Sequence, residues 1–372
     1  MNAWARGRLV ASPASYWTQA AVRGCKIEFG NEGNEVKVWQ VAREWSIDAM
    51  DLAERPEPSP GPGQILVRMH AASLNYRDLL TVQGKGGSHK LPLIPFSDGA
   101  GEIVAVGDGV TRVAVGDHVC PMFFQSWFDG RPSASNRRLA LGGTRPGVLQ
   151  ELMVLDAEGV SRIPSNLTFE QAATLPCAAL TAWRALFEEA HVRPGDTVLV
   201  QGTGGVSIFA LQFAKLAGAA VIVTSSSDDK LERSKTLGAD HTINYRSVPE
   251  WGKAAADWAG GGVDHIVEVG GKDTLHQSIE AAQVGGTILI IGVLSGFAQQ
   301  IAIPSIFGKN LRVIGLSVGS RRMFEKMTSA IERNNMKPVI DRTVAFDAVP
   351  DALKLMQQGG HFGKIVIQFA AS

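Results

Sequence analysis

The sequence predicts an α/β protein in which a mostly β domain is followed by a doubly wound parallel sheet. Three observations lead to this fold class. From Asp196 onward, apolar runs of strand length alternate with helical segments. Before that, from Glu35 to about Pro164, short strand-like runs such as "KVWQVA" and "GEIVAVG" are broken by Gly and Pro. The third observation is a glycine-rich turn between the first run of the alternating part and the helix that follows it.

The elements of the alternating part can be assigned in order. Its strands are expected at "TVLVQG", "AAVIVTS", "HTINY", "DHIVEVG", "TILIIGV" and "LRVIGLSV". Just before them, residues 165–190 predict two helical stretches on either side of Pro176, with Ser165 able to cap the first. The end of the chain, with its strand "GKIVIQF", is expected to return to the first domain. The predicted boundaries are an N-terminal arm over 1–34, a mostly β domain over 35–172, a nucleotide-binding domain over 173–318 and a C-terminal segment over 319–372.

Composition narrows the classes of partner. Lys plus Arg and Asp plus Glu are balanced at 36 each, so no global field favours nucleic acid or an anionic membrane, and a small molecule is the expected partner. No apolar run reaches the roughly 18 residues of a membrane helix. The cysteines Cys25, Cys120 and Cys177 form no CxxC motif, so we expect no disulfide framework and a cytoplasmic location. The arm is basic and carries no acid before Glu28; we expect poor order or an upstream start codon, with a transit-type presequence as the alternative.

The glycine turn "VQGTGGVS" predicts a dinucleotide site. Gly202 and Gly204 fit the first two positions of G-x-G-x-x-G, and the small residue Ser207 stands at the third. An apolar strand precedes the turn, and the following helix stops at Gly218. This is the context in which backbone N–H groups approach a pyrophosphate in a Rossmann fold. The expected contacts are Gly202, Thr203, Gly204, Gly205 and Val206.

The end of the second strand indicates which dinucleotide binds. NAD sites place an acidic residue about 20 positions after the loop, but this chain has Ser225 there, in "VTSSSDDKLERSK". A hydroxyl leaves room for a 2′-phosphate, and Lys230 or Arg233 could supply positive charge. Asp228 and Asp229 argue the other way, unless they are first-turn residues of a helix. NADP(H) is therefore the preferred cofactor, with NAD(H) as the alternative.

Four stretches resemble the medium-chain dehydrogenase/reductase superfamily, which includes alcohol dehydrogenases and quinone oxidoreductases. They are "PFSDGAGEIVAVG", "RPGDTVLVQGTGGVS", "LGADHTINYR" and "GVDHIVEVGG". The resemblance covers the chain from about Glu35. It implies that the parallel sheet binds NAD(P)H, that the first domain and the C-terminal segment form a GroES-like catalytic domain, and that the active site lies between them. It also implies a homodimer.

The chain departs from the zinc-dependent members at the metal site. Asn75 stands where those members have a cysteine ligand, and Arg77 where they have a proton-relaying hydroxyl. Ser97 and Asp98 align with their histidine and glutamate, and only Cys177 falls where a zinc ligand belongs. One thiolate among these groups is not a tetrahedral N/S site.

The lobe that would hold a second, structural zinc is also missing, since "CPMFFQSWFDG" and the residues after it contain only Cys120. We therefore expect no zinc.

Without a Lewis acid, conjugated acceptors are the easier hydride acceptors, because the negative charge is delocalised and a few donors can stabilise it. Asn75, Tyr76 and Arg77 are the candidate catalytic donors. The leading hypothesis is a zinc-independent, NADPH-dependent reductase of a quinone or an α,β-unsaturated carbonyl. The alternatives are an NADP-dependent alcohol or aldehyde oxidoreductase and an NADPH-binding protein without turnover. Each donor also has a structural alternative, such as pairing of Arg77 with Asp78.

The resemblance implies further site residues by position. Those expected around the substrate are Ser97, Asp98, Phe124, Trp127 and Cys177. Those expected around the cofactor are Thr181 under the nicotinamide, Tyr245 near the adenosine phosphate, Gly270, Gly292 and Val293 at strand ends, Ser320 and Arg321 near the domain junction, and Lys364 reaching back to the cofactor.

Overall fold

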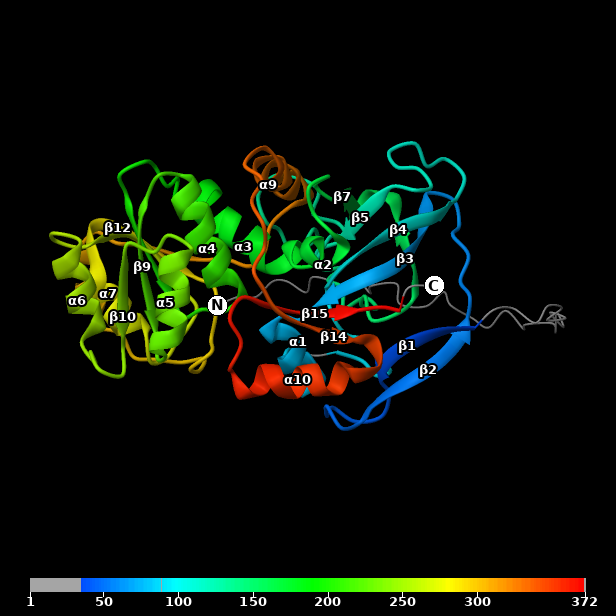
Figure 1. Ribbon diagram of the computed structural model, residues 1–372, viewed down its shortest axis with the longest axis horizontal. Helices are drawn as coiled ribbons and strands as arrows, with labels where there is room; N and C mark the ends of the chain where they lie inside the picture. Colours follow the sequence, from blue (N-terminus) through cyan, green and yellow to red (C-terminus); the bar gives the residue numbers. More distant parts are fainter. Residues whose placement is uncertain (1–34, 88, 371–372) are drawn as a thin grey trace, which may run out of the picture. The chain divides into compact units, whose positions relative to one another are not determined.

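A computed structural model describes residues 35–87 and 89–370 (Figure 1). The arm predicted over 1–34 lies outside these residues. Within them, no helix combines the length and the apolar character needed to cross a membrane.

The alternating part forms a parallel sheet of six strands within the described residues, in the order β10-β9-β8-β11-β12-β13. This is the strand order of a Rossmann fold, so the predicted fold class is confirmed. The strands are β8 (Thr197–Gln201), β9 (Ala220–Ser225), β10 (His241–Asn244), β11 (Val263–Glu268), β12 (Ala282–Ile290) and β13 (Arg312–Gly315). The helices that connect them are α4 (Gly205–Leu216), α5 (Asp228–Thr236), α6 (Trp251–Trp258), α7 (Leu275–Ala281) and α8 (Ile303–Phe307).

The earlier part and the end of the chain share a second sheet. In the described residues its order is β14-β15-β3-β4-β5-β7, with β6 also paired to β3 and a separate β1-β2 pair. The strands are β1 (Glu35–Val41), β2 (Met50–Pro56), β3 (Gln64–Ser73), β4 (Asp98–Val106), β5 (His118–Pro121), β6 (Leu152–Asp156), β7 (Val160–Arg162), β14 (Ile340–Ala345) and β15 (Lys364–Gln368). The helices are α1 (Tyr76–Val82), α9 (Arg321–Arg333) and α10 (Val349–Gln358), with short 3₁₀ turns at Ala157–Gly159 and Phe346–Ala348.

The last strand links the two sheets. β15 pairs antiparallel with β3, where Val366 lies opposite Ser73. Immediately before β15, Gly363 donates its N–H to the carbonyl of Thr203 in the glycine turn, at 2.9 Å. The C-terminal strand therefore touches both the turn and the sheet that carries α1.

The segment between the sheets is helical but does not begin where the sequence indicates. α2 (Phe169–Ala172) is capped by Thr168, whose hydroxyl accepts from the N–H of Gln171, while Ser165 instead donates to Glu332. Thr168 and Gln171 form a capping box, a stronger start signal than a lone serine. Two π-helical turns, Leu175–Ala179 and Arg184–Glu189, then flank α3 (Leu180–Trp183).

Candidate active site

The glycine turn has the geometry of an anion site. Gly202 has a φ of +68°, and α4 begins at Gly205 without a side-chain cap on its first N–H groups. A Cβ on Gly202 or Gly204 would meet no atom within 4 Å, so the space over the turn is open. Ser207 donates its hydroxyl to the carbonyl of Gln201 at 2.6 Å, which holds the helix against β8. The turn is thus able to receive a pyrophosphate.

The end of β9 gathers residues predicted for the adenosine end of the cofactor. Ser225 is buried, and its carbonyl accepts from the N–H of Tyr245 at 3.1 Å. Lys230 extends its Nζ to the carbonyl of Gly359, at 3.3 Å. Asp228 lies in the first turn of α5 and accepts from the amide of Asn244. The two aspartates that argued against NADP(H) are therefore first-turn helix residues.

A buried carboxylate that the sequence analysis missed shapes the neighbouring strand end. Glu268 is fully buried at the end of β11 and accepts from the N–H groups of Gly270 and Gly271, both at 2.9 Å. The amide of Gln201 and the hydroxyls of Thr274 and Ser278 also donate to it. The sequence signal for this buried carboxylate was an acidic residue within the apolar run "HIVEVGG". Gly292 packs closely on this loop, since a Cβ there would lie 2.3 Å from the carbonyl oxygen of Val269.

Asn75 is held in place by the start of α1. It is the N-cap of α1, and its backbone N–H donates to the carboxylate of Asp78 at 2.9 Å, in a capping box. The motif "NYRD" is the sequence signal for this box, although Asp78 was not predicted as a site residue. Tyr76, the next residue, is 38% exposed.

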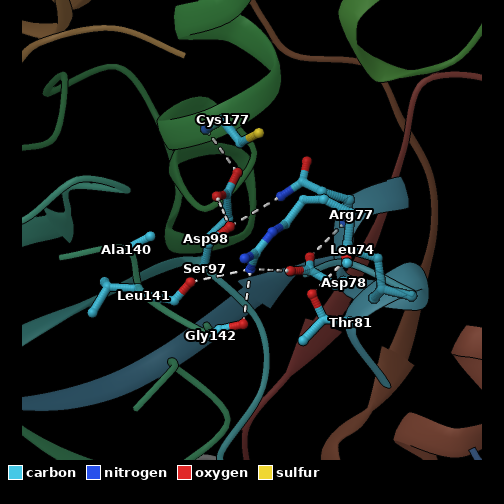
Figure 2. A network of polar contacts seen from close by, with 12 residues as sticks. Leu74, Arg77, Asp78, Thr81, Ser97, Asp98, Ala140, Leu141, Gly142 and Cys177 are labelled. Carbon is cyan, nitrogen blue, oxygen red and sulfur yellow. Dashed lines mark hydrogen bonds and ion pairs between the residues drawn. The ribbon is translucent and has the colours of Figure 1, made fainter. Parts of the chain in front are cut away.

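The guanidinium group of Arg77 makes structural contacts. This agrees with the alternative interpretation that Arg77 pairs with Asp78. Its Nη1 donates to Asp78 Oδ1 at 3.0 Å and to the carbonyls of Leu141 and Gly142 at 3.1 and 3.0 Å (Figure 2). Burial raises the pKa of the Asp78 carboxyl, and the charge of Arg77 acts against that rise. Because its charge is paired and its Nη1 is occupied, we no longer assign Arg77 as an oxyanion donor.

Ser97 and Asp98 form a buried polar pair at the start of β4. Asp98 accepts from the hydroxyl of Ser97 at 2.7 Å and from the backbone N–H of Cys177 at 2.9 Å (Figure 2). Phe96, just before them, has a φ of +71°, which is unfavourable for a bulky residue. Its backbone is held by Val148, which donates to the carbonyl of Phe96 at 3.0 Å. Burial raises the pKa of Asp98 to about 6, and the nearby charge of Lys364 opposes the rise.

Lys364 points to Asn75. Its Nζ is buried and donates to the carbonyl of Leu74 at 2.5 Å and to Oδ1 of Asn75 at 2.6 Å. The resemblance implied that Lys364 reaches back to the cofactor, whereas its hydrogen bonds in the structure are made to Leu74 and Asn75. Burial lowers the pKa of this amine, and the charges of Asp98 and Asp78 act against that fall.

The residues at the zinc-ligand positions do not fit a zinc ion. Among these positions only Cys177 offers a thiol or an imidazole; Oδ1 of Asn75 accepts from Lys364, and both carboxylate oxygens of Asp98 accept hydrogen bonds. Structural and catalytic zinc sites take three or four ligands from Cys, His and carboxylate side chains. Nowhere in residues 35–87 and 89–370 do three His, Cys, Asp or Glu side chains come together as possible metal ligands.

Several other predicted site residues are either buried or held in an ion pair. Trp127 is fully buried, with its indole N–H donating to the carbonyl of Gly130 and Arg184 over its ring, and Phe124 packs beside it. We correct the expectation that these two aromatic residues cover a substrate from an open loop. Arg321 pairs with Glu158, which neutralises its charge, so its predicted cofactor contact has no support. Two further predicted residues are buried, Thr181 on α3 and Ser320 as the N-cap of α9.

Two family models match the chain. Residues 61–165 match the alcohol dehydrogenase GroES-like domain, and residues 205–333 match the zinc-binding dehydrogenases. A zinc-type alcohol dehydrogenase-like protein of Schizosaccharomyces pombe is 46% identical over 315 residues, which cover 82% of this chain and 91% of that protein. A solved structure assigned to an alcohol dehydrogenase of Sinorhizobium meliloti 1021 is 44% identical with a TM-score of 0.85, and covers 91% of this chain and 100% of its own. The chain belongs to the medium-chain dehydrogenase/reductase superfamily.

Reductases are also found among the relatives in this superfamily. An acryloyl-coenzyme A reductase of Sulfurisphaera tokodaii is 27% identical over 325 residues, covering 85% of this chain and 96% of that protein. The crotonyl-CoA carboxylase/reductase AntE, solved in complex with NADP, is 26% identical with a TM-score of 0.79, covering 90% of this chain and 96% of its own. The protein is thus an alcohol dehydrogenase-like oxidoreductase of the superfamily.

Proposed function

We propose that this protein is a zinc-independent, NADPH-dependent reductase that transfers hydride to a quinone or an α,β-unsaturated carbonyl. The observation that carries the proposal is that residues at the metal-ligand positions already accept hydrogen bonds from the protein. The oxygen of Asn75 accepts from Lys364, and the carboxylate of Asp98 accepts from Ser97 and Cys177. A site whose oxygen atoms already accept hydrogen bonds, beside a buried amine, supports chemistry that needs donors rather than a metal.

The chain's own residues then have defined tasks. NADPH, when bound at the glycine turn, supplies the hydride, and reduction leaves negative charge on the oxygen of the acceptor. The Nδ2 group of Asn75 and the hydroxyl of Tyr76 are the proposed donors to that oxygen. Tyr76 is accessible enough to pass a proton to the reduced product, which completes the addition of H⁻ and H⁺.

The preference for NADP(H) is supported by the residues around the end of β9. Ser225 stands where a carboxylate would repel a 2′-phosphate, and Tyr245 lies directly beside it. Lys230 is anchored to Gly359 and brings positive charge to the start of α5.

An exposed apolar face supports the homodimer that the resemblance implies. β13 is an edge strand of the described sheet, and none of the residues of α8, next to it in sequence, is buried. Phe297, Ile303 and Phe307 are 76%, 65% and 66% exposed. An unpaired edge with large apolar side chains is a surface that a second copy would cover.

A substrate panel tests the proposal. NADPH oxidation is followed with 1,4-naphthoquinone, cyclohexenone and crotonyl-CoA, and NADP⁺ reduction with simple alcohols, before and after treatment with a zinc chelator. We expect turnover of the conjugated acceptors that the chelator does not change. Turnover of alcohols alone that the chelator does not change would establish the second candidate, an NADP-dependent alcohol or aldehyde oxidoreductase, which the names of the similar proteins favour. Turnover that is lost on chelation would overturn the zinc-independent site. Cofactor binding without any turnover would indicate a non-catalytic protein.

A further inference from the structure

The amine of Lys364 reaches the candidate active site from the far end of the chain. The residue begins β15, and its side chain passes over the start of α4, where a Cβ on Gly205 would lie 2.6 Å from Lys364 Cδ. Only 3% of the residue is exposed. A glycine at 205 is therefore required for this path, and the fold delivers a buried amine to Asn75, 289 positions away in the sequence.

This contact fixes which way the Asn75 amide faces. An ammonium has three donors and no acceptor, so the atom of Asn75 that lies 2.6 Å from Nζ must be the oxygen. The Nδ2 group then faces the other way, toward the hydroxyl of Ser97 at 3.5 Å and toward the carboxylate of Asp98, whose pKa its hydrogen bond lowers. That distance is long for a hydrogen bond, and the hydroxyl proton of Ser97 is already given to Asp98. Asn75 thus turns its donors away from Lys364, and its side-chain oxygen already accepts one hydrogen bond.

We propose that Lys364 is a positioning residue of the active site, whose ammonium holds the Asn75 amide so that Nδ2 donates to the oxyanion formed on hydride addition. The identity of that oxyanion, an enolate or a phenolate, rests on the proposed function. With Arg77 paired to Asp78, the ammonium is also the positive charge nearest to Asn75 that is not in an ion pair among the described residues. The arrangement orients the Nδ2 donors of Asn75 away from Lys364, which suits an acceptor whose oxygen becomes negative.

The kinetic test uses variants that separate positioning from cofactor binding. Lys364→Met removes the charge but keeps the length, Lys364→Arg restores a donor, and Asn75→Asp replaces Nδ2 by an acceptor. We expect kcat with 1,4-naphthoquinone to fall about 100-fold in N75D and at least about tenfold in K364M. The Kd for NADPH, measured by its fluorescence, should stay within about threefold of wild type, because the residue acts through Asn75. K364R should regain part of the loss, and Lys354→Met, at an exposed surface pair with Asp48, should change nothing.

A double variant shows whether Lys364 acts through Asn75. If it does, adding K364M to Asn75→Ala should lower kcat no further than N75A alone. Full additivity of the two losses would contradict the inference. An unchanged kcat in K364M with a much weaker Kd for NADPH would also overturn it, and would return Lys364 to the cofactor role expected from sequence.

A binding measurement makes the test independent of turnover. 4-Nitrophenolate mimics the proposed anion, and its absorbance reports its binding to the protein–NADP⁺ complex, with nitrobenzene as the uncharged control. We expect phenolate affinity to fall at least about tenfold in K364M and N75D while nitrobenzene is unaffected. No phenolate binding to wild type, or equal binding to K364M, would refute the inference. Phenolate binding that depends on Lys364, in a protein that reduces no quinone or enone, would support the inference and reject the proposed function.

Discussion

The buried carboxyl of Asp98 should make the stability of the fold depend on pH in a defined direction. Burial raises its pKa from 3.8 to about 6, against the opposing charge of Lys364. The folded state therefore holds this proton more tightly than the unfolded chain does. The stability it contributes is complete below pH 3.8 and is lost as the pH rises through about 6. At about 1.4 kcal/mol per pKa unit, the full loss is about 3 kcal/mol.

Asp98→Asn removes this titration and keeps an acceptor for the N–H of Cys177. About half of the loss has already occurred at about pH 5, so between about pH 5 and about pH 8 the variant should gain about 1.4 kcal/mol in its free energy of unfolding relative to wild type. Urea unfolding followed by tryptophan fluorescence at both pH values measures this change. Asp229→Asn, an exposed change in the first turn of α5, is the matched control and should show a pH-independent difference. The same difference between D98N and wild type at both pH values would refute the reasoning.

Three further predictions address the cofactor, the strand-end loop and the proposed dimer. Ser225→Asp should shift the ratio of kcat/KM for NADPH over NADH at least about tenfold toward NADH, because a carboxylate repels the 2′-phosphate; an unchanged ratio would place the phosphate elsewhere. Glu268→Gln should lower the free energy of unfolding by about 3 kcal/mol, measured by chemical denaturation, because buried N–H groups lose a charged acceptor; a loss below about 1 kcal/mol would contradict this. Phe307→Glu should yield monomers in size-exclusion chromatography with light scattering, whereas Val115→Glu, another exposed apolar site, should not; a monomeric wild type would remove the proposal.

The fold could be predicted because its signals are local. Most strands of the parallel sheet are apolar runs, and the turn at Gly202 needs only neighbouring residues to be recognised. The start of α2 was misplaced for a local reason too, since both Ser165 and Thr168 are good caps and only Thr168 has Gln171 three residues later.

The site was harder to predict because its contacts join distant parts of the chain. The sequence shows that Asn75 replaces a cysteine ligand of the zinc-dependent members. It does not show what holds Arg77, because the carbonyls that accept from it belong to residues 64 and 65 positions away. Trp127 lies in a polar-looking loop, and only the fold shows that it is fully buried. The direction of Lys364 depends on the pairing of β15 with β3. Side-chain partners across the fold decide these roles, and residue type alone does not.

The pairing of β15 has a consequence for biosynthesis. Gly363 closes on Thr203, Lys364 reaches Asn75, and Val366 aligns with Ser73, all within four residues near the C-terminal end of the chain. A polypeptide still attached to the ribosome before this stretch emerges has every other strand of both sheets but lacks the amine beside Asn75. If Lys364 positions Asn75 as proposed, such a chain would lack the group that orients the Asn75 amide, and activity is expected only once this stretch has folded.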